Sequence, residues 1–262
     1  MPKLEELHSA THFVLLRIVT VLILIAGASC SVAQSDAKSA YYGRRNTFGI
    51  FVAYSNDSSH ILLGDAENRK LMNIGVSYSR RLILNRIFNW QYSGELMPVV
   101  LESDPLSLYV QNQTSPTAST STFQGGPAVA CGALTIPYST TDPATGTVYS
   151  GTLVISCRGR RWTVGQAMSP AGLQLNFLPR HKLQPFLIGH GGYMYSTQAI
   201  PIDGAGSFNF TFDAGVGLEL YRSKSKSLRL EYRYHHISNN NTATLNPGID
   251  NGLFQVTYAF GR

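Results

Sequence analysis

The sequence has 262 residues, enough for one large domain or two small ones, and at 44% hydrophobic it is too polar for a bundle of membrane helices. Its 24 glycines and 14 tyrosines, with only 14% charged residues, favour strands and turns over long amphipathic helices. The formal net charge is +6, which for an exported chain indicates anionic lipid as a partner and no nucleic acid.

The first 33 residues have the pattern of a secretory signal peptide. Lys3 and Arg17 supply positive charge, and residues 18–26 form an apolar run. Ser31 and Ala33 then occupy the −3 and −1 positions of a cleavage site. We therefore expect an exported protein whose mature chain is a single barrel domain over residues 34–262.

Two other interpretations of the N-terminus stay open. The first is an uncleaved anchor over residues 13–28, although this segment is short for a membrane helix and contains Arg17. The second is a lipoprotein attached through Cys30, although Gly27 stands where a branched apolar residue is expected.

Alternation of apolar and polar residues with a period of two recurs eight times, and each run predicts a strand. In chain order the runs cover residues 48–54, 72–78, about 90–101, about 164–177, about 184–195, 208–220, 228–235 and 254–260. The sixth run is the most regular, since it alternates without a break.

One face of these strands carries large apolar side chains, and the other carries small or charged ones. In the sixth strand, Phe210 and Phe212 alternate with Thr211 and Asp213. The polar face also includes Glu219, Arg229, Glu231 and Arg233. Transmembrane barrels turn apolar residues to lipid and polar ones inward, so we predict an all-β, eight-stranded antiparallel transmembrane barrel with paired charges inside. A soluble lipocalin-like barrel is the structural alternative.

The connections between the predicted strands alternate in length. If the N-terminus is periplasmic, the inner turns, near Asn85, at 180–182 and at 223–227, are short. The outer loops are longer and cover residues 56–68, 103–162, 197–206 and 239–249. Short inner turns with longer outer loops are typical of bacterial outer-membrane barrels.

The longest outer connection, about 103–162, is rich in Ser, Thr, Pro and Gly and is predicted to be an extracellular loop insertion. It contains Cys131 and Cys157, the two cysteines left after signal cleavage. In an exported chain this pair predicts a disulfide. The spacing of Cys and His residues does not match a zinc site, so no metal is expected.

The segment 231–250 contains the residues that point to chemistry. In a strand, residues two apart share a face, so His236 and Ser238 point the same way. Asp250 begins the last strand, where it can sit across from His236, which would give a nucleophile, a base and an orienting acid. All three continue apolar, lipid-facing rows, whereas His235 points inward and is expected to be structural. The alternative is a set of polar residues at a loop edge without catalysis.

The stretch His236-Ile-Ser238-Asn239, followed by Asn246-Pro-Gly-Ile-Asp250, resembles the PagL family of lipid A 3-O-deacylases. These are eight-stranded outer-membrane barrels with the active site on the outer surface. The resemblance implies His236 as base, Ser238 as nucleophile and Asp250 as the acid, at a position where the family has Glu. It favours Asn239 and Asn246 as oxyanion donors. Looser resemblance in strand pattern extends from about residue 163 to the end.

The function expected from this resemblance is hydrolysis of an ester-linked acyl chain of lipid A, with no cofactor. The expected location is the outer membrane, the expected partner is lipopolysaccharide, and a homodimer is left open. Arg158, Arg160 and Arg161 lie just before the fourth strand, where guanidinium groups suit a lipid A phosphate, although a solvated loop edge would have the same pattern. The alternative function is a non-enzymatic small barrel, an OmpA-like adhesin or envelope-stabilising protein.

Overall fold

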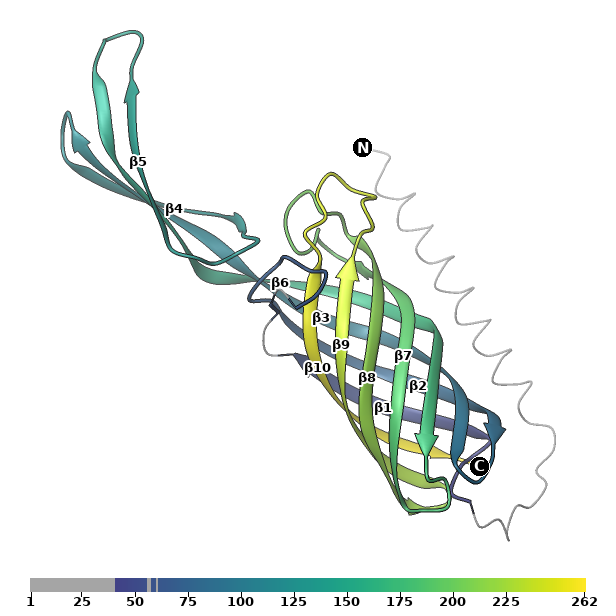
Figure 1. Cartoon of the computed structure of the whole chain (residues 1–262). Coiled ribbons are helices and arrows are strands. Elements are labelled where there is room, and N and C mark those ends of the chain that lie inside the picture. The colour runs from purple at the N-terminus through teal and green to yellow at the C-terminus, as the bar shows by residue number, and fades with distance from the viewer. Residues whose placement is uncertain (1–40, 56–57, 60) are drawn as a thin grey trace. The chain divides into compact units, whose positions relative to one another are not determined.

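The computed structural model describes residues 41–55, 58–59 and 61–262 (Figure 1). The signal peptide expected in residues 1–33 lies outside the described residues. The described chain is built of strands, and it contains no helix with the length and apolar character needed to cross a membrane.

Ten antiparallel strands form one sheet in the described part of the chain. They are β1 (Asn46–Ser55), β2 (Lys70–Leu84), β3 (Phe88–Ser115), β4 (Ser119–Pro127), β5 (Leu134–Thr141), β6 (Val148–Phe177), β7 (Leu183–Ser196), β8 (Phe208–Ser223), β9 (Lys226–Ser238) and β10 (Ile249–Gly261). Their order is β4-β3-β2-β1-β10-β9-β8-β7-β6-β5, and β3 also pairs with β6. This pairing closes every strand except β4 and β5 into a ring, which confirms the predicted eight-stranded barrel (Figure 1).

The barrel wall has apolar side chains outside and polar ones inside. Along β8, Phe210 and Phe212 are 44% and 50% exposed, whereas Thr211 and Asp213 are buried. On β1 the same pattern leaves Ile50 56% exposed. A barrel in water would bury its apolar face, so this wall is that of a transmembrane barrel and excludes the soluble alternative.

The interior of the barrel contains charged side chains that form ion pairs with one another, as expected. Arg233 lies at the centre of this network and contacts Glu95 at 2.7 Å, Glu231 at 2.9 Å and Asp213 at 3.3 Å. His235 also points inward and is buried, as the alternation predicts. Because a buried ion is costly unless it is paired, these contacts explain how a narrow, polar interior is tolerated.

The segment 103–162 differs from the prediction of a loop. The second half of β3 and the first half of β6 continue past the barrel as a paired ribbon, and β4 and β5 pair with their outer edges (Figure 1). Its many Thr residues favour strands, and the ribbon satisfies their backbone groups without burying an apolar face. The predicted disulfide between Cys131 and Cys157 is confirmed.

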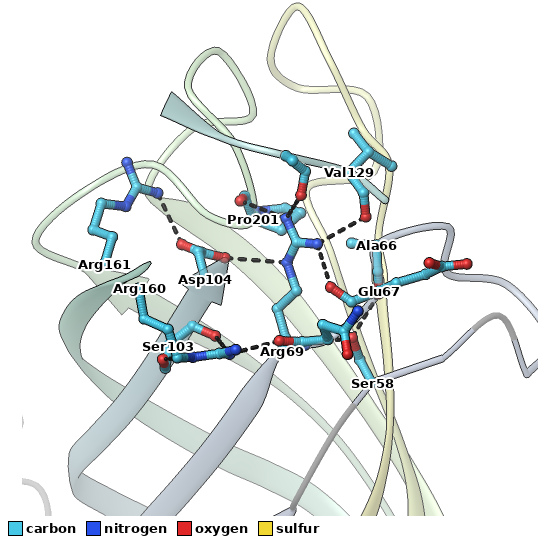
Figure 2. Close-up of polar contacts among 12 residues, drawn as sticks. Ser58, Ala66, Glu67, Arg69, Ser103, Asp104, Val129, Arg160, Arg161 and Pro201 are labelled. Atoms are coloured by element: carbon cyan, nitrogen blue, oxygen red, sulfur yellow. Dashed lines mark hydrogen bonds and ion pairs between the residues drawn. The ribbon is translucent and has the colours of Figure 1, made fainter. Parts of the chain in front are cut away.

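Three connections at one end of the barrel meet at Arg69, which is fully buried (Figure 2). Its Nε contacts Asp104 Oδ1 at 3.2 Å. Its two Nη atoms donate to the backbone carbonyls of Glu67, Ala128, Val129 and Pro201. One guanidinium therefore joins the first outer loop, the β4–β5 connection and the β7–β8 loop, and it fixes the base of the first loop.

Candidate active site

His236 and Asp250 form a hydrogen-bonded pair across β9 and β10. The antiparallel register sets Asp250 directly opposite His236, and His236 Nδ1 lies 2.7 Å from Asp250 Oδ1. An ionised carboxylate only accepts hydrogen bonds, so Nδ1 carries the proton and Nε2 is left as the acceptor of the imidazole. The distance also shows that Asp, one methylene shorter than Glu, reaches the ring.

The Asp250 carboxylate also receives hydrogen bonds from Tyr234 and from backbone amides of the first outer loop. Tyr234 Oη donates to Oδ1 at 2.8 Å, and the backbone N–H groups of Leu62 and Leu63 donate to Oδ2 at 2.7 and 2.8 Å. Asp250 belongs to an outward row, as predicted, but it is fully buried because the first outer loop covers it. These donors belong to the protein itself, so the loop and the strands together hold the carboxylate in place.

Sequence reasoning missed the Tyr234 hydroxyl and the loop amides that bind Asp250. Tyr234 stands two residues before His236 in the same row, so the alternation contained a signal for it. The amides of Leu62 and Leu63 gave no signal, because every residue except proline has a backbone N–H.

The Ser238 hydroxyl forms its hydrogen bonds with two asparagines and not with His236. Its Oγ donates to Asn246 Oδ1 at 3.0 Å and accepts from Asn240 N at 3.1 Å. No hydrogen bond joins Ser238 and His236 among the described residues, although both lie in the outward row of β9. The expected contact between nucleophile and base is therefore absent from this arrangement of the site.

The two candidate oxyanion residues differ. Asn239 is buried, and its side-chain amide donates to the backbone carbonyls of Ala205 and Leu245, so this side chain holds loops together. Asn246 accepts with Oδ1 from Ser238 Oγ and from Asn239 N. Its Nδ2 makes no hydrogen bond within the described residues, which leaves a free donor beside the serine.

The three candidate arginines also differ. Arg160 donates to Ser103 and to a carbonyl of the first loop, and Arg161 pairs with Asp104 at 2.9 Å and with Asp203 at 2.7 Å. Arg158 is exposed, and its side chain has no ion pair in the described part of the chain. Only Arg158 thus keeps its guanidinium free for a ligand.

One cluster has the residue types of a metal site. Glu95, His190 and Asp213 place ligand atoms within 4.8 Å of one another inside the barrel. Arg233 Nη1 already lies among them, at 2.9 Å from Glu95 Oε2 and 3.2 Å from His190 Nδ1. A guanidinium in this position repels a cation, so the cluster is a set of interior ion pairs.

On the outward face, the site thus contains a hydroxyl, an imidazole and a carboxylate, with an amide donor next to the hydroxyl. Such groups suit acyl transfer, in which a base activates the hydroxyl and a donor stabilises the oxyanion. The carboxylate and imidazole are already in contact, whereas the hydroxyl has to turn from Asn246 to join them.

Solved structures similar to this chain include three outer-membrane proteins. The outer membrane enzyme PagL has 10% identity over 82% of this chain and 99% of its own, with a TM-score of 0.44. Neisserial surface protein A has 10% identity over 83% and 97%, with a TM-score of 0.40. The COG4313 outer membrane channel from Pseudomonas putida F1 has 9% identity over 88% and 99%, with a TM-score of 0.26. No curated protein matches the sequence.

Residues 137–259 match the family model described as lipid A 3-O-deacylase (PagL). The matched range contains His236, Ser238 and Asp250, together with β9 and most of β10, the two strands that carry them. The lipid-facing wall and this match locate the protein in the outer membrane. Over residues 137–259 the chain is therefore similar to the PagL family of lipid A 3-O-deacylases.

Proposed function

We propose that this protein is a lipid A deacylase that hydrolyses an ester-linked acyl chain with Ser238, His236 and Asp250. The observation that carries the proposal is the His236–Asp250 pair at 2.7 Å, on the outward face of a transmembrane barrel and within the range matched by the family. A histidine oriented by a carboxylate is the base that a serine nucleophile requires.

In the first step Ser238 Oγ leaves Asn246 Oδ1 and attacks the ester carbonyl carbon, while His236 Nε2 takes its proton. Catalytic hydrogen bonds are often long or absent before substrate binds, so the present Ser238–Asn246 bond is compatible with this step. The Asp250 carboxylate stabilises the imidazolium that forms. His236 then gives its proton to the departing sugar oxygen, and an acyl-enzyme remains.

In the second step water, deprotonated by His236, attacks the acyl-enzyme and releases the fatty acid and the free Ser238 hydroxyl. In both steps negative charge develops on the former carbonyl oxygen. Asn246 Nδ2, beside Ser238 and without another partner among the described residues, is the side-chain donor suited to it.

Lipid A would enter from the side, because the outward row of β9 faces the outer leaflet. Arg158 is the candidate contact for a lipid A phosphate, since its side chain is exposed while Arg160 and Arg161 are paired. We expect Arg158→Gln to raise KM for phosphorylated lipid A, whereas Arg86→Gln, an exposed arginine near the opposite end, should not change it.

Mass spectrometry of lipid A after incubation with the protein in detergent micelles tests the proposal. The wild type should remove one acyl chain, and Ser238→Ala should leave lipid A intact. Ser225→Ala, in the β8–β9 turn, is the matched control and should behave as the wild type. Intact lipid A with folded wild-type protein would contradict the proposal and favour the non-enzymatic barrel.

A further inference from the structure

The first outer loop carries three consecutive exposed aliphatic residues. Ile61, Leu62 and Leu63, here called the loop ridge, are 45%, 68% and 65% exposed. Exposed aliphatic residues are ordinary when they are scattered, but three in succession at the tip of a loop that is otherwise polar need a partner. No other described part of the chain supplies one, since the three side chains remain exposed.

The loop ridge is docked on the barrel at both ends. Before it, Ser59 N donates to Asp250 O at 3.2 Å, and after it Asp65 N and Ala66 N donate to Pro247 O and Gly248 O at 2.6 and 3.1 Å. A Cβ on Gly64 would lie 2.6 Å from Asp250 N, so the loop backbone packs directly on β10. The three side chains therefore project from a fixed backbone.

The same backbone brings the loop ridge next to the candidate site. The amides of Leu62 and Leu63 hold Asp250 Oδ2, and Asp250 Oδ1 holds His236 Nδ1. A molecule that contacts these leucine side chains is therefore next to residues whose amides bind Asp250 directly.

The loop ridge also continues the lipid-facing wall. Tyr54 ends the outward row of β1 just before the loop and pairs with Phe254 of β10, which pairs with Tyr232 of β9. These three side chains are 49%, 50% and 58% exposed on the face that contacts lipid. Acyl chains of lipid are the apolar molecules that can bury such a surface, because it continues a wall that already faces lipid.

We propose that the loop ridge contacts the acyl chains of outer-leaflet lipid and guides the scissile acyl chain to Ser238. This inference rests on the proposed function for its substrate. It assigns two tasks to one segment, because the side chains of Leu62 and Leu63 bind the acyl chain while their amides hold Asp250.

The kinetic test is the double variant Leu62→Gln/Leu63→Gln, which removes the apolar side chains and keeps both amides. The measurement is kcat/KM for lipid A in mixed micelles and for p-nitrophenyl acetate, whose two-carbon acyl group offers almost no apolar surface to the loop ridge. We expect the lipid A to p-nitrophenyl acetate ratio to fall about tenfold or more, the effect of losing one buried aliphatic contact or more. An equal loss of kcat/KM with both substrates would overturn the proposal, because the leucine side chains would then act only by keeping Asp250 in position.

The matched control is Leu82→Gln/Ile83→Gln. These are also consecutive aliphatic residues, 55% and 50% exposed, but they lie at the other end of β2. Their replacement should leave the ratio of the two activities unchanged. If the activity ratio fell equally in this control, the proposal would also be overturned. The loss of apolar side chains anywhere on the lipid-facing wall would then explain the effect, without a special role for the loop ridge.

A measurement that needs no activity separates the loop ridge from the proposed function. A nitroxide label on Leu62→Cys, in vesicles of phosphatidylcholine containing lipid A, should be accessible to oxygen and shielded from a water-soluble nickel complex. Ile50→Cys serves as the lipid-facing reference and Ser225→Cys as the aqueous one, and Cys131 and Cys157 take no label because they are bonded. A label on Leu62 that behaves as the aqueous reference would overturn the proposal even if lipid A is hydrolysed. Wild-type protein inactive on both substrates, with a lipid-exposed label, would overturn the proposed function alone.

Discussion

Glu95 and Asp250 are both buried carboxylates, yet the protein holds them in opposite ways. Glu95, inside the barrel, receives two bonds from the Arg233 guanidinium, at 2.7 and 2.9 Å. Asp250, on the outward row, receives its bonds from backbone amides of the first outer loop, a tyrosine hydroxyl and an imidazole N–H. The first carboxylate is neutralised by a permanent cation, whereas the second keeps its charge.

This difference separates a structural carboxylate from one suited to catalysis. A carboxylate bound to a guanidinium has its field cancelled at short range and serves the fold. A carboxylate held by neutral donors remains available to stabilise a positive charge that appears only during a reaction. Four substitutions test this distinction and a fifth tests the extension, from the largest expected effect to the smallest.

His236→Asn should lower lipid A hydrolysis by about 10⁴-fold, because the base is lost while the barrel interior is untouched. The heat-modifiable gel mobility of the folded barrel should be that of the wild type. Asn replaces the ring with a group that can still accept from solvent but cannot shuttle a proton. Hydrolysis at a tenth of the wild-type rate or more would show that the imidazole is not the base.

Arg233→Met should destabilise the barrel by about 3–5 kcal/mol, since Glu95 and Glu231 lose a buried partner. The urea midpoint of unfolding in micelles measures this loss. Activity per folded molecule should stay within about twofold, because neither carboxylate faces the site. Arg158→Met, at an exposed arginine, is the control and should leave the midpoint unchanged.

Asp250→Asn should lower kcat by about 10²-fold, a smaller loss than at the base, because an orienting group acts through its histidine. Asp250→Glu should also lower it, since the added methylene displaces the carboxylate from the Leu62 and Leu63 amides. Steady-state kinetics on lipid A measures both variants. An Asp250→Glu enzyme as active as the wild type would show that the amides are not needed to place the carboxylate.

Tyr234→Phe should lower kcat by about tenfold, the effect of one hydrogen bond to a charged acceptor at about 1.5 kcal/mol. The matched control is Tyr232→Phe, two residues earlier in the same row and without a hydrogen bond to Asp250. If both variants lose activity equally, the effect comes from the lipid-facing row and not from the carboxylate.

Replacing Cys131 and Cys157 by serine should have the smallest effect on the barrel. The bond closes a segment of 26 residues in the β3–β6 extension, where chain entropy predicts a local stabilisation of about 3 kcal/mol. Limited proteolysis of the extension should become faster, while lipid A hydrolysis and the urea midpoint stay as in the wild type. A lowered urea midpoint would show that the extension stabilises the barrel, for example through the Arg69 contacts to Ala128 and Val129.

Period-two alternation was sufficient to predict the eight strands of the ring and their two faces. It also assigned His236, Ser238 and Asp250 to outward rows, because the direction of a side chain in a strand depends only on its place in the pleat. The extension was mistaken for a loop, since a ribbon with two exposed faces has no apolar row to mark it.

The setting of each candidate residue was decided by tertiary contacts. Asp250 is covered by amides 187 and 188 residues away, Asn239 binds the β7–β8 loop, and Arg161 pairs with Asp104. Local sequence determines which way a side chain points, because the pleat repeats every two residues. It does not determine which backbone group arrives from a distant loop, because that depends on the closed ring bringing loops from different parts of the chain to one end of the barrel.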